Sequence, residues 1–390
     1  MLIRSRIGFV SSFIAFIVFL SSTVYAGKQV PWHRVWSCHG GNSGNAGITS
    51  IHHIKGRVGW TVPVAENQIS IVVFDGKGNG YYCSGTGGET PEYFLTSIYT
   101  LYGATRWRKK IPTAKYGRLI TWDLFTPAVD ASGNVYVVSL NGILYAYRGK
   151  DGGMIWRCDL HPKNTHGAIS YPICWKSIVF TNTASGCCAV NATTGKKIWD
   201  MVGCYLQAVS DKAVYVASEK GIQAIQHNTG KLIREFPVAG GLVYKNGFLY
   251  TTEQCSTRFS RWDAETGKIQ WSVKKHNEFH SQDVAFAGNS VYKAVTNPSS
   301  GMNFLNEYNL QTGKSRKVKS LEFCFDCGLL VDSDGCIFTQ TMDSLWAVDI
   351  RTGKIKWKIP MKTFVLGKTL SISPEGWLFM TSDQSIRAVE

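Results

Sequence analysis

The sequence predicts an all-β fold, an eight-bladed β-propeller made of four-stranded antiparallel blades. Two repeated phrases indicate it. The first combines a Thr-Gly-Lys turn with a following Trp and reads AVNATTGKKIW at 189–199, RWDAETGKIQW at 261–271 and AVDIRTGKIKW at 347–357. The second is a polar turn followed by an aromatic strand, as in ASGNVYVVS at 131–139, and it precedes most copies of the first. Repetition of this kind is the sequence signature of stacked structural units.

One unit can be explained residue by residue. Short runs in which Val, Ile, Tyr and Phe alternate with polar residues are typical of half-buried strands. Asp or Asn ahead of Thr-Gly-Lys predicts a tight hairpin, because Gly adopts positive φ without a steric penalty. A single antiparallel sheet of this size cannot bury both faces, so neighbouring units must stack. No segment of comparable length shows helical periodicity.

The Trp at the end of each first phrase predicts the contact between units. The 364 residues after position 26 divide into eight units of about 45 residues, a usual length for a four-stranded blade. We call the position that ends each first phrase the corner of its unit. Six of the eight corners carry the expected inter-blade Trp: Trp60, Trp107, Trp156, Trp199, Trp271 and Trp357. Arg234 and Arg316 occupy the other two corners, where we expect looser packing.

The two ends of the chain predict how the ring closes. The last strand phrase, at 374–390, ends where another Thr-Gly-Lys turn would be due. The missing outer strand is supplied by Ile54–Val62, which lacks preceding blade strands of its own. This pairing would remove two exposed sheet edges. We therefore expect residues 27–390 to form a single propeller domain.

The first 26 residues predict a signal peptide. Arg4 and Arg6 precede the apolar run Ile7–Leu20, and Val24-Tyr25-Ala26 offers small residues for cleavage before Gly27. The run is shorter than a bilayer span, although a retained anchor is the alternative. We expect a monomeric protein that is secreted or delivered to another exported compartment, the periplasm or the secretory-pathway lumen. The 11 cysteines suit such an oxidising compartment.

Cys324-Phe325-Asp326-Cys327 is an isolated C-x-x-C. Metal or redox chemistry would require a second pair or a helix start, and the haem form is absent because Gly328 follows. We expect structural cysteines instead, with a disulfide inside this pair or to a neighbour such as Cys336. The odd number of cysteines leaves at least one thiol free or paired between molecules.

The Thr-Gly-Lys phrases resemble the repeat of the pyrroloquinoline-quinone (PQQ) propeller superfamily. Residues 36–42, WSCHGGN, are similar to the usual opening of its members. This superfamily contains quinone-dependent alcohol dehydrogenases and also non-catalytic propellers, among them the scaffold lipoprotein of the bacterial outer-membrane assembly machine. The resemblance therefore implies a fold and leaves the function open.

Cys187 and Cys188 are adjacent, and the resemblance gives them a possible cofactor role. Quinone dehydrogenases carry an adjacent Cys-Cys disulfide against the quinone ring. The structural interpretation is favoured by position, since the pair lies in a blade strand where other copies have Leu144-Tyr145 and Leu345-Trp346. Buried Cys packs there as a small apolar residue, and an adjacent disulfide would strain a regular strand. No calcium ligand or acidic base of those enzymes is recognisable; DGKGNG at 75–80 is better explained as a hairpin turn.

Basic residues recur at equivalent turns. Because equivalent turns of a propeller open on one face, we expect a basic rim suited to an anionic partner. Its residues are Lys196, Lys197, Lys231, Lys268, Lys314, Arg316, Lys317 and Lys354. The net charge of +15 points the same way, although Lys is also simply a common, soluble turn residue.

Two hypotheses about function follow. The first is an exported, non-catalytic scaffold without a cofactor that recognises a protein, an anionic polysaccharide or a membrane surface. The second is a dehydrogenase-like oxidoreductase that uses PQQ with calcium in the central funnel, with Cys187 and Cys188 at the cofactor. Nucleic acid is not an expected partner, because no motif for it is present.

Overall fold

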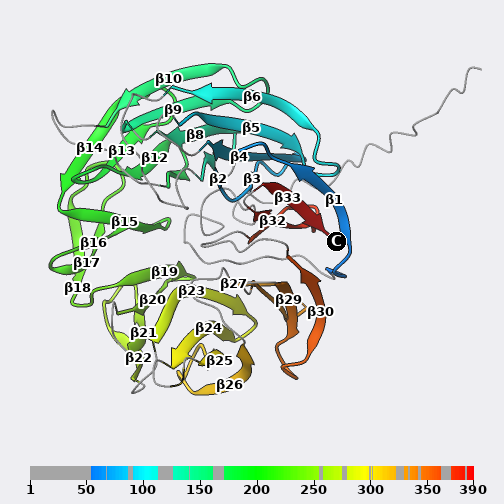
Figure 1. The fold of residues 1–390 in the computed structure, drawn as a ribbon. Helices are drawn as coiled ribbons and strands as arrows, with labels where there is room; N and C mark the ends of the chain where they lie inside the picture. The colour runs from blue at the N-terminus through cyan, green and yellow to red at the C-terminus, as the bar shows by residue number, and fades with distance from the viewer. Residues whose placement is uncertain are drawn as a thin grey trace, which may run out of the picture.

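The described residues of the computed structural model form a ring of eight β-sheets (Figure 1). They are residues 54–66, 68–86, 91–112, 126–139, 141–160, 171–253, 258–274, 279–297, 300, 302–321, 329–332, 334–340, 344–361, 370–382 and 384–390. These residues contain strands and turns and no helix, hence no helix that could cross a membrane. The predicted eight-bladed, all-β architecture is confirmed.

The blades follow one another along the chain, each running from its innermost to its outermost strand. The first four are β2 (Gln68–Ile69), β3 (Val73–Phe74), β4 (Asn79–Gly85), β5 (Tyr93–Tyr99) and β6 (Thr105–Ile111); β7 (Ala128–Val129), β8 (Asn134–Val138), β9 (Ile143–Arg148) and β10 (Met154–Asp159); β11 (Ile173–Trp175), β12 (Ile178–Asn182), β13 (Gly186–Asn191) and β14 (Lys197–Val202); and β15 (Cys204–Val209), β16 (Val214–Ser218), β17 (Gly221–Ile225) and β18 (Leu232–Phe236). In the first blade, β2 and β3 both pair with β4.

The second half of the ring repeats this order. Its blades are β19 (Gly241–Lys245), β20 (Phe248–Thr252), β21 (Arg258–Asp263) and β22 (Ile269–Lys274); β23 (Phe279–Ala287), β24 (Ser290–Asn297), β25 (Met302–Asn309) and β26 (Ser315–Leu321); β27 (Leu329–Val331), β28 (Cys336–Gln340), β29 (Ser344–Asp349) and β30 (Ile355–Pro360); and β31 (Leu370–Ile372), β32 (Leu378–Ser382), β33 (Ser385–Val389) and β1 (Val58–Pro63). All strand pairs are antiparallel.

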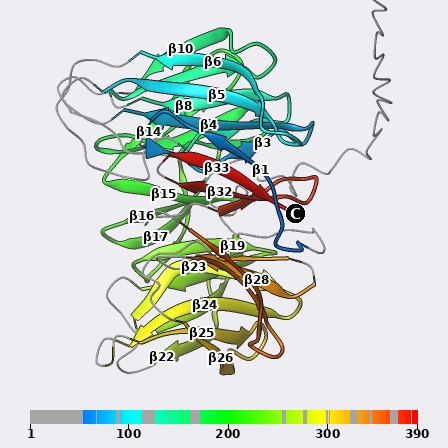
Figure 2. The same ribbon diagram turned by 45° about the vertical axis from the view of Figure 1, so that its right-hand side comes forward.

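The ring closes with the N-terminal strand, as the sequence predicted. β1 pairs with β33 from Val58↔Val389 to Pro63↔Ser385, so the eighth blade contains strands from both ends of the described chain (Figures 1 and 2). The indole Nε1 of Trp357 donates to the Ile54 carbonyl at 3.0 Å, which joins the seventh blade to the eighth. Closure thus involves both a sheet ladder and a blade-to-blade hydrogen bond.

Seven outer strands carry a β-bulge directly before the corner residue, whereas in β26 the bulge falls at Val318, two residues after Arg316. In the third blade, Ala189 pairs with Trp199 but Val190 pairs with Lys197, which leaves Ile198 without a ladder partner. Similar register shifts occur beside Trp107, Trp271 and Trp357. A bulge increases local twist and redirects the side chains beside it, so the repeated bulge sets the direction of the corner side chain.

Corner side chains join each blade to the next. Trp107, Trp156 and Trp271 donate from Nε1 to carbonyls of Gly149, Ala192 and Leu310, at 2.9, 2.9 and 2.8 Å. Trp60 and Trp199 donate in the same way to Thr100 and His227. Arg234 and Arg316 reach next-blade carbonyls too, those of Thr266 at 3.1 Å and Ile350 at 3.2 Å. The Arg corners therefore keep a hydrogen bond between blades.

The hydrophobic core lies mainly between neighbouring blades. One cluster joins Tyr136 and Leu144 of the second blade to Cys188 of the third. The next joins Cys187 of the third blade to Leu206 of the fourth. Because side chains alternate between the two faces of a strand, the second to seventh blades each contribute to two clusters, whereas the first and eighth belong to one cluster that spans the ring closure. Inner strands such as β7, β27 and β31 are buried along their whole length.

Candidate functional site

The two hairpin turns of a blade lie side by side. The turn between its third and fourth strands bonds to the turn between its first and second: Ala192 N to Ser177 O at 2.8 Å, Ala264 N to Gly247 O at 2.9 Å and Leu310 N to Asn289 O at 2.9 Å. Since rotation about the ring relates the blades, these paired turns share one face of the propeller. We call it the hairpin face.

Five turns of the hairpin face have nearly the same geometry. In four of them an Asn or Asp Oδ1 accepts backbone N–H bonds from the next residues, as in Asp263 with Glu265 and Thr266 at 3.0 and 2.7 Å. A Gly with φ between 66° and 74° follows in all five, a conformation that disfavours other residues. A Lys follows each of these Gly, and its backbone N donates to the Oγ1 of the turn Thr at 3.2–3.4 Å. These residues are Lys196, Lys231, Lys268, Lys314 and Lys354.

These five side chains, which we call the rim lysines, are exposed. None of them forms an ion pair with another described residue. The other basic residues predicted for the rim are engaged locally: Lys197 with Asp200 at 3.3 Å, Arg316 with Glu307, and Lys317 over the Phe304 ring at 3.5 Å. The rim lysines are thus the part of the predicted set that is free to meet a partner.

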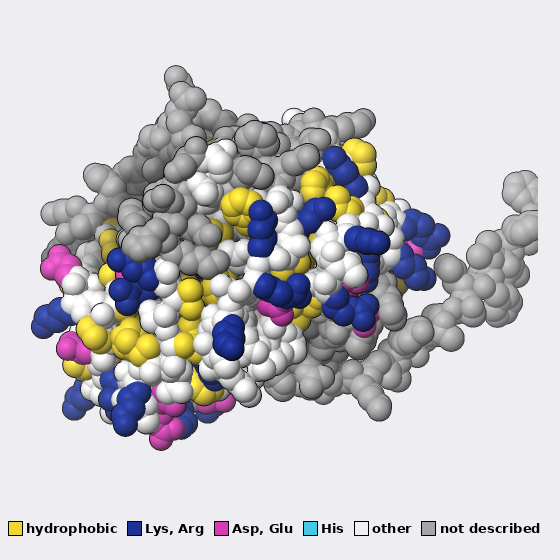
Figure 3. All heavy atoms as spheres, turned by 90° about the horizontal axis from the view of Figure 1, so that it is seen from below, with side chains coloured by type: hydrophobic (Ala, Val, Ile, Leu, Met, Phe, Trp, Pro, Cys, Tyr) yellow, Lys and Arg dark blue, Asp and Glu magenta, His cyan; other side chains and the backbone are white. Residues whose placement is uncertain are grey.

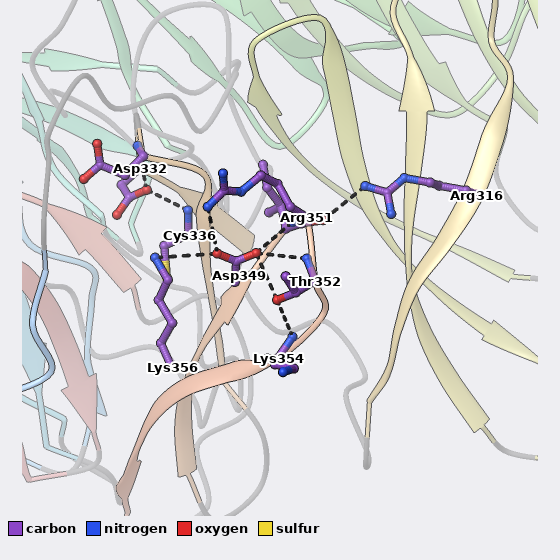
Figure 4. A network of polar contacts seen from close by, with 10 residues as sticks. Arg316, Asp332, Cys336, Asp349, Arg351, Thr352, Lys354 and Lys356 are labelled. Carbon is purple, nitrogen blue, oxygen red and sulfur yellow. Dashed lines mark hydrogen bonds and ion pairs between the residues drawn. The ribbon is translucent and has the colours of Figure 1, made fainter.

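The seventh-blade turn shows how much positive charge gathers at one position (Figure 4). Asp349 accepts from the backbone of Arg351 and Thr352, and hydrogen bonding by Thr352 N lowers the pKa of its carboxyl. Arg351 and Lys356 lie 3.7 and 3.9 Å from the same carboxylate. A single carboxylate offsets only part of the charge of these two basic side chains, and Lys354 extends from the same turn.

Basic side chains are also spread over the side of the molecule in Figure 3, with acidic and apolar side chains between them. Two further basic residues of the hairpin face were not among those predicted from the sequence. Arg351 lies in the seventh-blade turn, and Lys212, in the first turn of the fourth blade, bonds to Glu265 of the fifth at 2.5 Å. The sequence signal for Lys212 is its place in the polar turn of SDKAVYVAS at 210–218.

Cys187 and Cys188 point to opposite faces of β13 and are 1% and 0% exposed. Cys187 packs in the cluster between the third and fourth blades, Cys188 in the one between the second and third. A disulfide stacked on a quinone would need both sulfurs on one accessible side. These residues therefore do not fit the cofactor arrangement that the resemblance implied. Burial also raises the pKa of the Cys188 thiol to about 12, which makes it unreactive.

The remaining predicted positions are distributed as follows. Cys336 begins β28, is buried and carries a free thiol in this structure. Cys324, Cys327, the predicted signal peptide 1–26 and the opening at 36–42 lie outside the described residues. DGKGNG at 75–80 forms a hairpin turn in which Asp75 Oδ1 accepts from Lys77 N at 2.8 Å. In the part of the chain that the structure describes, no group of three or more His, Cys, Asp or Glu is placed to hold a metal ion.

Eight four-stranded blades with these turns and corners define a propeller of the PQQ-repeat class. A sequence profile of the family described as outer membrane protein assembly factor BamB matches residues 95–210 and 189–389. The chain therefore belongs to this family. A search of curated proteins found no significant match.

Solved structures agree on the fold. The crystal structure of BamB from Moraxella catarrhalis has a TM-score of 0.62 at 14% identity, covering 86% of this chain and 99% of that one. Quinohemoprotein alcohol dehydrogenase ADHIIG from Pseudomonas putida HK5 gives 0.69 at 11% identity, with 92% and 80% covered. The computationally designed Ika8 protein gives 0.64 at 14%, with 84% and 97% covered. At such identities the likeness concerns the fold alone.

Proposed function

We propose that this protein is an exported, non-catalytic binding propeller that recognises an acidic protein partner through the rim lysines. The single observation that carries the proposal is their arrangement. Five turns with the same geometry present five exposed lysines that have no ion-pair partner among the described residues. Like charges spaced along an arc attract an extended anionic surface and raise its association rate.

A protein partner is favoured over other anionic surfaces by family membership, because the family takes its description from an assembly factor. The same membership supports export to a compartment such as the periplasm. The apolar side chains next to the rim suit a protein surface as well: Ile198, Leu232, Ile269 and Ile355 are all exposed beside a Thr-Gly-Lys turn. A partner with both acidic and apolar groups would match this pattern.

The test reverses the charge of the rim lysines together and measures binding to three immobilised probes: polyglutamate, heparin and vesicles rich in anionic lipid. We expect the wild-type protein to bind polyglutamate at about 150 mM salt, and the variant to lose at least about tenfold in affinity. The substitutions are Lys196→Glu, Lys231→Glu, Lys268→Glu, Lys314→Glu and Lys354→Glu.

A matched control changes the net charge equally but elsewhere, on outer strands and the β16–β17 turn. Its substitutions are Lys109→Glu, Arg157→Glu, Lys220→Glu, Lys274→Glu and Lys358→Glu. We expect the control to keep most of the wild-type affinity. Equal losses in both variants would show that only net charge matters, which contradicts the proposal. Binding to vesicles but not to polyglutamate would indicate a membrane as the partner, and binding to heparin alone would indicate a polysaccharide. Either result would contradict the proposed protein partner.

A further inference from the structure

Cys187 and Cys204 meet in a buried contact between two blades. Cys187 lies on β13, the third strand of the third blade, and Cys204 begins β15, the first strand of the fourth. Their Sγ atoms are 2.8 Å apart, and each residue is 1% exposed. This distance is shorter than a van der Waals contact between two unbonded sulfur atoms, so the two side chains already lie close to bonding range.

The backbone around both cysteines is held in place by other contacts. Gly203 N donates to Ser185 O at 2.8 Å, and Leu206 N donates to Asn182 Oδ1 at 2.6 Å. These two bonds flank the cysteine pair and join the two blades. Because a disulfide requires an S–S distance of roughly 2.05 Å, the sulfurs need to approach by less than about 1 Å, a change that side-chain rotation can supply.

Other described cysteines are less suitable partners. Cys188 projects to the opposite face of β13, into the cluster that holds Cys158 and Cys174. Cys83 and Cys336 belong to a different cluster. The Cys187–Cys204 contact also lacks the further ligands that a metal ion would need, since no metal-holding group occurs among the described residues.

We propose that Cys187 and Cys204 form an inter-blade disulfide in the exported protein. The oxidant is a small-molecule or protein disulfide of the exported compartment. Its S–S bond breaks as the Cys187–Cys204 bond forms, and the two electrons and two protons of the cysteine thiols pass to it, leaving two thiols. Because both sulfurs are buried in the folded ring, the exchange takes place before the third and fourth blades have fully packed.

The bond would add a covalent link between the third and fourth blades. The residues it joins are 17 positions apart, so it closes a short loop and restricts the unfolded chain. The link runs from the third strand of the third blade to the first strand of the fourth. Once formed, it would resist reductants until the protein unfolds.

Mass spectrometry of the full chain, purified from an oxidising compartment, tests the proposal. The protein is alkylated in denaturant without reductant and digested with trypsin. Cleavage after Lys176, Lys196, Lys197 and Lys212 places Cys187 and Cys188 in peptide 177–196 and Cys204 in peptide 198–212. We expect these two peptides to be linked and to separate on reduction.

Variants identify the bonded sulfur. The linked peptides should persist in Cys188→Ser and disappear in Cys187→Ser and in Cys204→Ser. The last two should each melt about 4 °C below the wild type, and the double variant should fall no further. Full alkylation of both wild-type peptides, or a link that survives in Cys187→Ser, would overturn the proposal. The wild-type and Cys188→Ser digests decide the question even if the other variants fail to fold.

Discussion

Replacing Trp271 by Ala is expected to lower the free energy of unfolding by about 4 kcal/mol. The indole is almost fully buried and makes edge contacts with Phe259 and tilted contacts with Tyr250. It also packs against Gly313 of the next blade and donates to Leu310 O at 2.8 Å. The substitution would leave a large cavity and remove a hydrogen bond between the fifth and sixth blades.

The matched comparison is Arg234→Ala, at the corresponding corner of the fourth blade. Arg234 donates one hydrogen bond to Thr266 O at 3.1 Å from a more exposed position, so we expect a loss of about 1 kcal/mol. Urea denaturation of both variants, monitored by far-ultraviolet circular dichroism of the backbone, measures the two losses in unfolding free energy. Losses of similar size at the two corners would contradict the assignment of Trp271 as an anchor between blades.

Gly186→Ala should cost about 3 kcal/mol, the second large effect on stability. An added Cβ would lie 1.8 Å from the Met201 carbonyl oxygen, on the paired strand β14. Because this neighbour is backbone, it cannot rotate away, and the β13–β14 pair must separate or shift. The strain falls on the third blade, which also carries Cys187.

Gly203→Ala serves as the control for this prediction. Gly203 lies in the connection that follows β14 and has a φ of 72°, but an added Cβ there meets nothing within 4 Å. Only the backbone conformation opposes the change, so we expect a loss of about 1 kcal/mol. Denaturation midpoints of the two variants provide the measurement, and a Gly186→Ala protein as stable as Gly203→Ala would refute the steric account.

The architecture was predictable because the repeat is local. Each Thr-Gly-Lys turn, its preceding Asn or Asp and its following Trp interact within about ten residues, so their spacing is visible in the chain. The number of blades follows from counting them, and the unpaired strand Ile54–Val62 indicates how the ring closes. The structure places that strand at Val58–Pro63, and just before it Arg57 and Glu390 exchange two backbone hydrogen bonds that extend the pairing with β33.

Contacts between blades were less predictable because they join residues from different repeats. The sequence indicated that corner Trp side chains lie between blades, but not that Nε1 donates to a turn carbonyl of the next blade. Likewise, strand alternation explains why Cys187 and Cys188 diverge, whereas the approach of Cys187 to Cys204 depends on how β15 packs against β13. Cysteine spacing alone carries no such information.

In our proposal, this propeller binds a partner and does not use a quinone. Calorimetric titration of the purified protein with PQQ and calcium tests it most directly, with circular dichroism showing that the protein is folded. We expect no saturable heat, because Cys187 and Cys188 are buried on opposite faces of β13. Saturable one-to-one binding at micromolar or tighter affinity would contradict this proposal and favour the cofactor hypothesis.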